Sequence, residues 1–505
     1  MSDSHQIEQF NIENPNRLYS KRESGMSTNS DIIEDEVDSN DNIIFESEAA
    51  SLDLGLKSKY GVKRAYCGIR GDSEISCILN IVVSAIGGGC FSLPYLMYEG
   101  GIVVSLIIFL FVTVCVAYTI DLLRSFVVDT KYFSFALMTE TILGPVWLKV
   151  YAVSSFVIYV SMEVSYLTSI YFYISSIILP QNQKNQESSE NQEDSGTLLF
   201  GIIYFIITMI IEVFICLYIS KIAKMHLLSI ISISCFFLLL FTLIIISLVA
   251  NIKGDVGSKF TYKNLFFPDL QPDTVTNKIL SISSFLTEYV YSYLYQSTFP
   301  TILGNMKNVT QSTTQKVHLI SFGIIFGAYL ITTIFGFIMS DNVPTEIFKY
   351  DNSNYFKGGW EYLIIPYKIV LCAFYLTLIP LRFIVLRDNY ITLIGEKKMT
   401  FLKELLIISI FIFICNIFVF GVQQFDDINK NLNIKSLIQA FGGIFGVIIS
   451  FVLPVINYKS VNGIKKIKSI IGYIISGIFG IAALLSTANS IYQIIFKENK
   501  SEAPQ

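Results

Sequence analysis

Apolar stretches long enough to cross a lipid bilayer recur along this chain and constrain its fold more than any other feature. A membrane-spanning helix needs about 20 predominantly apolar residues. Because 52% of the 505 residues are hydrophobic and only 15% are charged, these stretches cannot all be buried in a water-soluble core. The sequence therefore predicts an all-α, polytopic membrane protein with about eleven transmembrane helices. The expected spans are residues 74–98, 101–123, 149–179, 197–219, 227–250, 279–303, 318–340, 360–386, 403–421, 434–456 and 468–496.

The segment before the first span is polar and acidic. Between Asp31 and Asp53 it has many carboxylates and no Lys or Arg, a composition typical of disordered chain. We therefore expect a disordered tail over 1–72, a transmembrane domain over 73–496 and a short C-terminal tail over 497–505.

Cationic residues gather just before the first span, which sets the expected orientation. Positive side chains stay on the cytoplasmic side of a membrane, so the N-terminal tail is expected to be cytoplasmic. No signal peptide is recognised at the N-terminus. The sequence leaves open whether the membrane is the plasma membrane or a vacuolar or other internal membrane. The cations in question are Lys57, Lys59, Lys63, Arg64 and Arg70.

The first span contains three consecutive glycines, Gly87 to Gly89, followed by Pro94. Glycines and proline together destabilise a continuous helix, and unpaired backbone groups are costly in hydrocarbon unless protein or ligand satisfies them. Small residues can also serve close helix packing. The density of breakers nevertheless favours a discontinuous helix whose exposed amides and carbonyls bind a ligand with both a carboxylate and an ammonium, such as an amino acid.

The sixth span is the most polar of the eleven and holds a second candidate break. Residues 287–300 combine Glu288 with four tyrosines and end in Pro300. Five spans separate this stretch from the glycine-rich one, as expected for two inverted repeats of five helices, spans 1–5 and 6–10, each beginning with a discontinuous helix, plus an eleventh span. A tyrosine belt at the membrane surface is the alternative.

Glu163, Glu212 and Glu288 lie within predicted spans, and so does Lys368. An ionisable residue inside a membrane is costly and indicates function. Glu288 is our first candidate for carrying a proton, and Glu163 is a second. The structural alternative is a buried ion pair between Glu288 and Lys368.

No pattern in the chain indicates catalysis or cofactor binding. The three histidines, His5, His226 and His318, are scattered, so no histidine cluster for metal binding or acid–base chemistry is expected. We expect no catalytic residues, no metal and no cofactor. A nucleic-acid partner is not expected either, because no domain is basic.

The ordered motifs resemble the amino acid/auxin permease family, which includes sodium-coupled neutral, proton-assisted and vacuolar amino acid transporters. The likeness runs from Glu74 to Ile495. It is carried by Asn80 with Gly87-Gly88-Gly89 and Leu93-Pro94-Tyr95, Val164-Ser165-Tyr166-Leu167, Phe299-Pro300-Thr301-Ile302 through Met306-Lys307, Thr377 to Arg387 with Pro380, and Gly442-Gly443 with Leu453-Pro454.

The resemblance implies an inverted-repeat transporter fold and a substrate held at the two breaks. Sodium-coupled members carry a second Asn where this chain has Val83, which disfavours sodium. The ending of span six is similar to the proton-using branch, although Gln296 stands where that branch often has His. Thr377 and backbone carbonyls remain as sodium ligands. The expected substrate-binding residues are Ser84, Gly87, Gly88, Gly89, Tyr166, Tyr291, Ser292 and Tyr295.

The sequence thus predicts a secondary active transporter rather than an enzyme. It would move amino acids by alternating access, with protons as the expected coupling ion and sodium or purely facilitated transport as alternatives. A second hypothesis is an amino acid sensor that uses the same site and signals through the acidic tail. A channel ranks last, because no ring of charged side chains is evident.

Overall fold

The computed structural model describes residues 73–178, 193–221, 225–252, 275–339, 364–394, 400–428, 442–462 and 467–496. The regular structure of these residues is helical throughout, as the sequence predicts. The expected N-terminal tail, 1–72, and C-terminal tail, 497–505, lie outside the described residues.

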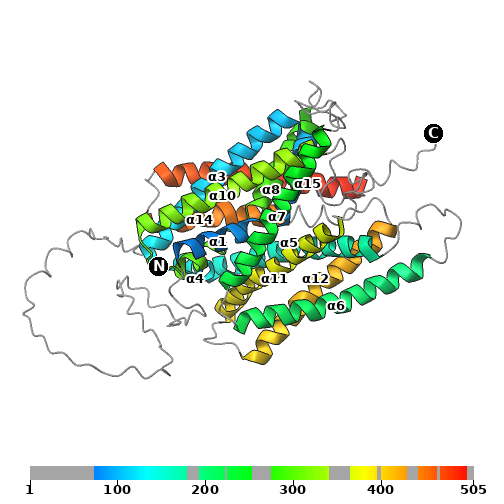
Figure 1. The fold of residues 1–505 in the computed structure, drawn as a ribbon. Coiled ribbons are helices and arrows are strands. Elements are labelled where there is room, and N and C mark those ends of the chain that lie inside the picture. The colour runs from blue at the N-terminus through cyan, green and yellow to red at the C-terminus, as the bar shows by residue number, and fades with distance from the viewer. Residues whose placement is uncertain are drawn as a thin grey trace, which may run out of the picture. The chain divides into compact units, whose positions relative to one another are not determined.

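The helices follow one another along the chain as the pattern of apolar stretches predicts (Figure 1). The first half contains α1 (Glu74–Ala85), η2 (Gly88–Phe91), α2 (Leu93–Gly100), α3 (Ile102–Thr130), α4 (Phe135–Leu143), α5 (Pro145–Ile178), α6 (Glu193–Lys221) and α7 (Met225–Ile252). The second half contains α8 (Val275–Ser292), α9 (Phe299–Gly304), α10 (Gln311–Ile338), α11 (Ile364–Ile394), α12 (Phe401–Ile428), a helical turn at 442–447, η7 (Ile448–Val452), α14 (Leu453–Asn462) and α15 (Ile467–Phe496).

Eight helices among the described residues are long and apolar enough to cross a membrane, and a bent pair makes a ninth span. The two remaining predicted spans correspond to α6, whose apolar part is Gly201–Leu217, and to α8 with α9. Large apolar side chains such as Ile107, Val114 and Phe214 are exposed on the outside of the helices, as expected where lipid replaces water as the solvent.

The first span is discontinuous, which confirms the prediction from its glycines and proline. The helix Glu74–Ala85 and the helical segment Gly89–Gly100 meet at an angle of 60°. Ser73 caps the first helix by accepting a hydrogen bond from Ser76 N at 3.2 Å. Pro94 lies in the first turn of α2, where its missing N–H costs no hydrogen bond.

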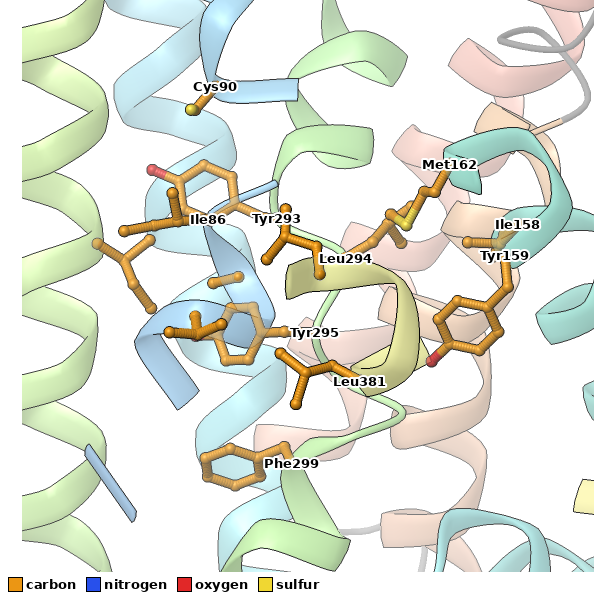
Figure 2. Packing of buried hydrophobic residues seen from close by; sticks show 14 of the residues in the cluster. Ile86, Cys90, Ile158, Tyr159, Met162, Tyr293, Leu294, Tyr295, Phe299 and Leu381 are labelled. Atoms are coloured by element: carbon orange, nitrogen blue, oxygen red, sulfur yellow. The ribbon is translucent and has the colours of Figure 1, made fainter. Parts of the chain in front are cut away.

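The sixth span is discontinuous as well. Its first helix, α8, ends at Ser292, and α9 begins at Phe299, with Pro300 in its first turn. Figure 2 shows the residues between them as a non-helical trace, with Tyr293 and Tyr295 on the side of Ile86. The break contains no glycine, so its open backbone is maintained by contacts with neighbouring helices.

Helix packing has the symmetry of two repeats of five spans. Spans 1 to 4 each contact the span five positions later: α1 contacts α9, α3 contacts α10, α5 contacts α11 and α6 contacts α12. Other contacts come in matched pairs. Span one packs on span seven (α1 on α10), as span six packs on span two (α8 on α3). Span five packs on span eight (α7 on α11), as span ten packs on span three (η7 on α5). Because each repeat has an odd number of spans, the two repeats cross the membrane in opposite directions.

One helix lies outside the predicted spans. Residues 124–148 lie between the predicted spans 101–123 and 149–179, yet Phe135–Leu143 forms the short helix α4. Ser134 precedes it and accepts a hydrogen bond from Leu137 N at 3.5 Å, a capping interaction typical of helix starts. The buried side chains of Phe135 and Met138 attach α4 to the core.

Candidate functional site

A cavity lies where the two broken spans approach each other. Its volume is about 40 Å³, room for only a few water molecules. Four spans supply its walls, namely spans one, three, six and eight. The lining residues are Ala85, Gly87, Gly89 and Ser92 from the first span, Met162, Ser165, Tyr166 and Ser169 from α5, Glu288, Tyr291 and Ser292 from α8, and Tyr375 and Arg382 from α11.

Tyr329 connects the two breaks. Its hydroxyl, on α10, lies 2.6 Å from the carbonyl oxygen of Ala85 and 2.5 Å from that of Ser292. These carbonyls end the first helical halves of spans one and six, where no following amide completes the helical pattern. A single buried hydroxyl therefore serves both ends and maintains their spacing.

Ser292 joins the breaks a second time. Its hydroxyl lies 3.2 Å from the carbonyl oxygen of Gly89 and 3.1 Å from that of Glu288. A Cβ atom built on Gly89 would lie 3.0 Å from Ser292 Cα. Gly89 is thus needed for this close approach, because the Cβ atom of any other residue would press against the backbone of Ser292.

A buried arginine faces the cavity from α11. The Arg382 side chain is 2% exposed. Its Nη1 donates to the carbonyl of Leu294 in the span-six break at 3.4 Å, and its Nη2 donates to the Tyr166 hydroxyl at 3.1 Å. Tyr375 stacks on Tyr166 with ring centroids 5.2 Å apart, which fixes the ring that receives this hydrogen bond.

The two carboxylates predicted to carry a proton occupy different environments. Glu288 lines the cavity and is half-buried. Glu163 is fully buried on α5, and neither of its carboxylate oxygens has a hydrogen-bond partner among the described residues. Lys368 does not line the cavity, and its Nζ donates to Ser176 Oγ at 2.7 Å.

Most of the residues expected to bind substrate come together here. Those that line the cavity are Gly87, Gly89, Tyr166, Tyr291 and Ser292. Gly88 is the first residue of η2 within the same unwound segment.

Two expected residues lie elsewhere. Ser84 is buried and donates to Asn80 O of its own helix at 2.7 Å. Tyr295 is also buried away from the cavity, with its ring 6.4 Å from that of Phe299. Met162, Tyr375 and Arg382 are lining residues that the sequence did not single out.

Two positions bear on sodium coupling, Val83 and Thr377. Val83 is buried and apolar. Thr377 donates its hydroxyl to Phe374 O at 2.7 Å. Within the described segments, no group of three or more His, Cys, Asp or Glu side chains is placed to hold a metal ion.

Comparisons with known proteins agree with this architecture. A family model described as "Transmembrane amino acid transporter protein" matches residues 70–496. The solved structure of MhsT in complex with L-phenylalanine is similar in fold, with a TM-score of 0.54 and 16% identity, over 83% of this chain and 99% of that one. A manganese transporter from Eremococcus coleocola, in complex with an aromatic bis-isothiourea substituted compound, gives a TM-score of 0.53 and 11% identity, over 86% of this chain and 88% of that one.

Proposed function

The chain belongs to the family of transmembrane amino acid transporter proteins, and we propose that it carries amino acids across a membrane by secondary active transport. It acts as a transporter and performs no chemistry on its substrate. The observation that carries this proposal is the cavity between the two broken spans, which Glu288 and Arg382 line with opposite charges. An amino acid also carries one charge of each sign, so its ammonium and carboxylate match this wall. The phenylalanine complex of MhsT supports the same substrate class.

The size and position of the cavity support alternating access as the mode of transport. At about 40 Å³ it is too small for an amino acid, so the surrounding helices must separate for substrate to enter. The walls come from both inverted repeats, and relative movement of the repeats would open the site to one side of the membrane at a time. The hydrogen bonds of Tyr329 and Ser292 across the breaks are those most directly affected by that movement.

Proton coupling is the proposed energy source. Glu288 at the cavity wall and Glu163, buried on α5, are carboxylates that can take up and release a proton. Val83 offers no side-chain oxygen where the resemblance places the second Asn of sodium-coupled members. The cationic residues before the first span support a cytoplasmic N-terminus. The membrane is proposed to be either the plasma membrane or a vacuolar or other internal membrane.

The test is uptake of radiolabelled amino acids into proteoliposomes that contain the full-length protein. Uptake is measured with an inward proton gradient, an inward sodium gradient, or neither. The proposal predicts accumulation with the proton gradient alone. Accumulation that needs sodium would contradict proton coupling, and equal uptake in all three conditions would indicate a facilitative carrier.

The same assay distinguishes a transporter from an amino acid sensor. An amino acid sensor would bind substrate without moving it, so binding with no flux under any gradient would favour a sensor. Removal of residues 1–72 adds a second criterion. A transporter is expected to keep its flux after this deletion, whereas a sensor would lose its signal.

A further inference from the structure

Arg382 is a buried cation whose hydrogen-bond acceptors are both neutral. They are the Leu294 carbonyl and the Tyr166 hydroxyl, and no described carboxylate forms an ion pair with the guanidinium. A guanidinium remains charged at any physiological pH, and burying a charge is costly unless an opposite charge compensates it. Because the side chain also lines the cavity, an anion brought by a ligand would compensate it.

The position of Arg382 places its charge against the first break. A Cβ atom built on Gly87 would lie 3.1 Å from Arg382 Nη2 and would contact the Tyr166 hydroxyl. Glycine is therefore what allows the guanidinium and the tyrosine to approach the unwound backbone. An anionic group bound there would lie between span one, α5 and α11.

Glu163 lies on the same face of α5 as the tyrosine that receives the arginine hydrogen bond. It follows Tyr159 by four residues and precedes Tyr166 by three, spacings that align side chains along one face of a helix. Arg382 acts electrostatically on Glu163, but the two groups do not form an ion pair or a hydrogen bond. An unpaired buried carboxylate is costly when ionised, so the arrangement is compatible with the neutral acid.

The other groups around Glu163 offer no compensating positive charge among the described residues. Glu212 acts on Glu163 from α6, and it accepts a hydrogen bond from Asn416 Nδ2 of α12 at 3.4 Å. Arg382 is therefore the described cation whose charge acts on Glu163 when that carboxyl loses its proton. The remaining titratable groups that interact electrostatically with Glu163 are Tyr204, Cys216 and Cys415.

We propose that Arg382 binds the carboxylate of the transported amino acid and that Glu163, once deprotonated, competes for the same guanidinium. This inference rests on the proposed function and specifies how substrate and proton are linked. With Glu163 protonated, Arg382 is available and substrate binds. When the Glu163 O–H releases its proton to the water that the opened cavity faces, the new carboxylate pairs with Arg382 and the substrate carboxylate leaves. One proton and one substrate thus move in the same direction.

The sign of the pH dependence distinguishes Glu163 from Glu288. Competition by ionised Glu163 weakens substrate binding as the pH rises. Glu288 faces the cavity and would bind the substrate ammonium in its ionised form, so protonation of Glu288 weakens binding as the pH falls. The proposal therefore predicts that affinity decreases with increasing pH and that this decrease depends on Glu163.

The test measures binding to the purified full-length protein by isothermal titration calorimetry. A thermal-shift screen of the twenty L-amino acids selects the strongest binder, which is then compared with its own carboxamide. Since a hydrogen bond to a charged group contributes about 1.5–3 kcal/mol, the wild-type protein should prefer the amino acid by about 10- to 100-fold. Arg382→Gln should reduce this preference to about one.

The matched control is Arg387→Gln, five residues along α11, because Arg387 pairs with Glu404 at 3.3 Å and lies outside the cavity. It should keep the preference for the amino acid. Where Arg382→Gln fails to give a monodisperse protein, Arg382→Lys replaces it and should keep the preference while lowering affinity. Three results would overturn the proposal. Arg382→Gln could keep the preference for the amino acid, Arg382→Lys could lose it, or the wild type could bind the amino acid and its carboxamide equally well.

Glu163→Gln tests the second half of the inference. The wild-type affinity should fall between about pH 6.5 and about pH 8.5, whereas Glu163→Gln should bind equally well at both. A variant that retains the full pH dependence overturns the role of Glu163. If no amino acid binds the wild-type protein, the proposed function itself fails, and this outcome is distinct from binding without preference for the carboxylate.

Discussion

The guanidinium of Arg382 donates a hydrogen bond to the hydroxyl of Tyr166 at 3.1 Å. This contact joins α11 to α5, the helices of spans eight and three, which occupy equivalent places in the two repeats. It places a permanent positive charge at the wall of the cavity. Tyr166 is therefore a positioning residue, since its hydroxyl orients the group proposed to bind the substrate carboxylate.

Replacement of this tyrosine by phenylalanine tests the positioning role. Tyr166→Phe keeps the ring that stacks on Tyr375 and removes the acceptor of Arg382. We expect affinity for the amino acid to fall by about 10-fold and affinity for its carboxamide to stay the same, as measured by titration calorimetry. An equal loss for both ligands would indicate general damage to the pocket.

Tyr118→Phe is the control for this variant. Tyr118 is half-buried on α3 and donates to Lys468 O at 2.5 Å, so the Tyr118→Phe variant also loses one tyrosine hydrogen bond. Neither ligand should bind differently to it, because Tyr118 is outside the cavity.

Loss of the Tyr329 hydroxyl should weaken the link between the breaks. Tyr329→Phe leaves the buried carbonyls of Ala85 and Ser292 without the one proton that they share, at a cost of about 1–3 kcal/mol. We expect a lower melting temperature in detergent, together with reduced uptake into proteoliposomes. A melting temperature equal to that of the wild type would show that other donors replace the hydroxyl.

The glycines of the chain provide a matched pair of substitutions. Gly89→Ala places a methyl group 3.0 Å from Ser292 Cα, so it should separate the two breaks and abolish uptake. Gly327→Ala adds the same methyl group within α10, where nothing lies within 4 Å. It should be neutral or stabilising by up to about 1 kcal/mol, because alanine favours helix. Equal transport by the two variants would contradict the close approach at Gly89.

A buried polar cluster away from the cavity should matter for stability. Asn416 on α12 donates to Glu212 and has its side-chain oxygen 3.1 Å from Thr208 Oγ1. Asn416→Leu leaves both partners on α6 without this amide, and we expect destabilisation by about 1–3 kcal/mol. Thermal unfolding of the detergent-solubilised protein measures the change. Amino acid affinity should be unaffected, and a loss of affinity without a loss of stability would assign the cluster to the binding site.

The breaks were predictable because their causes are local. Gly87 to Gly89 and Pro94 disfavour a continuous helix wherever they occur in an apolar span. In span six, the density of polar residues marked the second break, and Glu288, Tyr291 and Ser292 line the cavity. Tyr295 does not, because α8 ends at Ser292 and Tyr295 is buried away from the cavity.

Arg382 could not be assigned in the same way, because its role depends on how α11 packs against α5. In the sequence it lies near the end of the span predicted over 360–386, close to Arg387, where cations are common at a membrane surface. Only the packing of the helices brings it to Tyr166 and to the break in span six. Glu163 was identifiable as an intramembrane carboxylate, but its neighbour Arg382 was not.

A cryo-EM structure of the full-length protein with its best-binding amino acid would test the central claim most directly. The account predicts ligand density between the unwound segment at Gly87–Gly89 and Ser292, with the carboxylate against Arg382 and the ammonium toward Glu288. Ligand density outside this cavity, or a ligand in the cavity with its carboxylate turned away from Arg382, would contradict it.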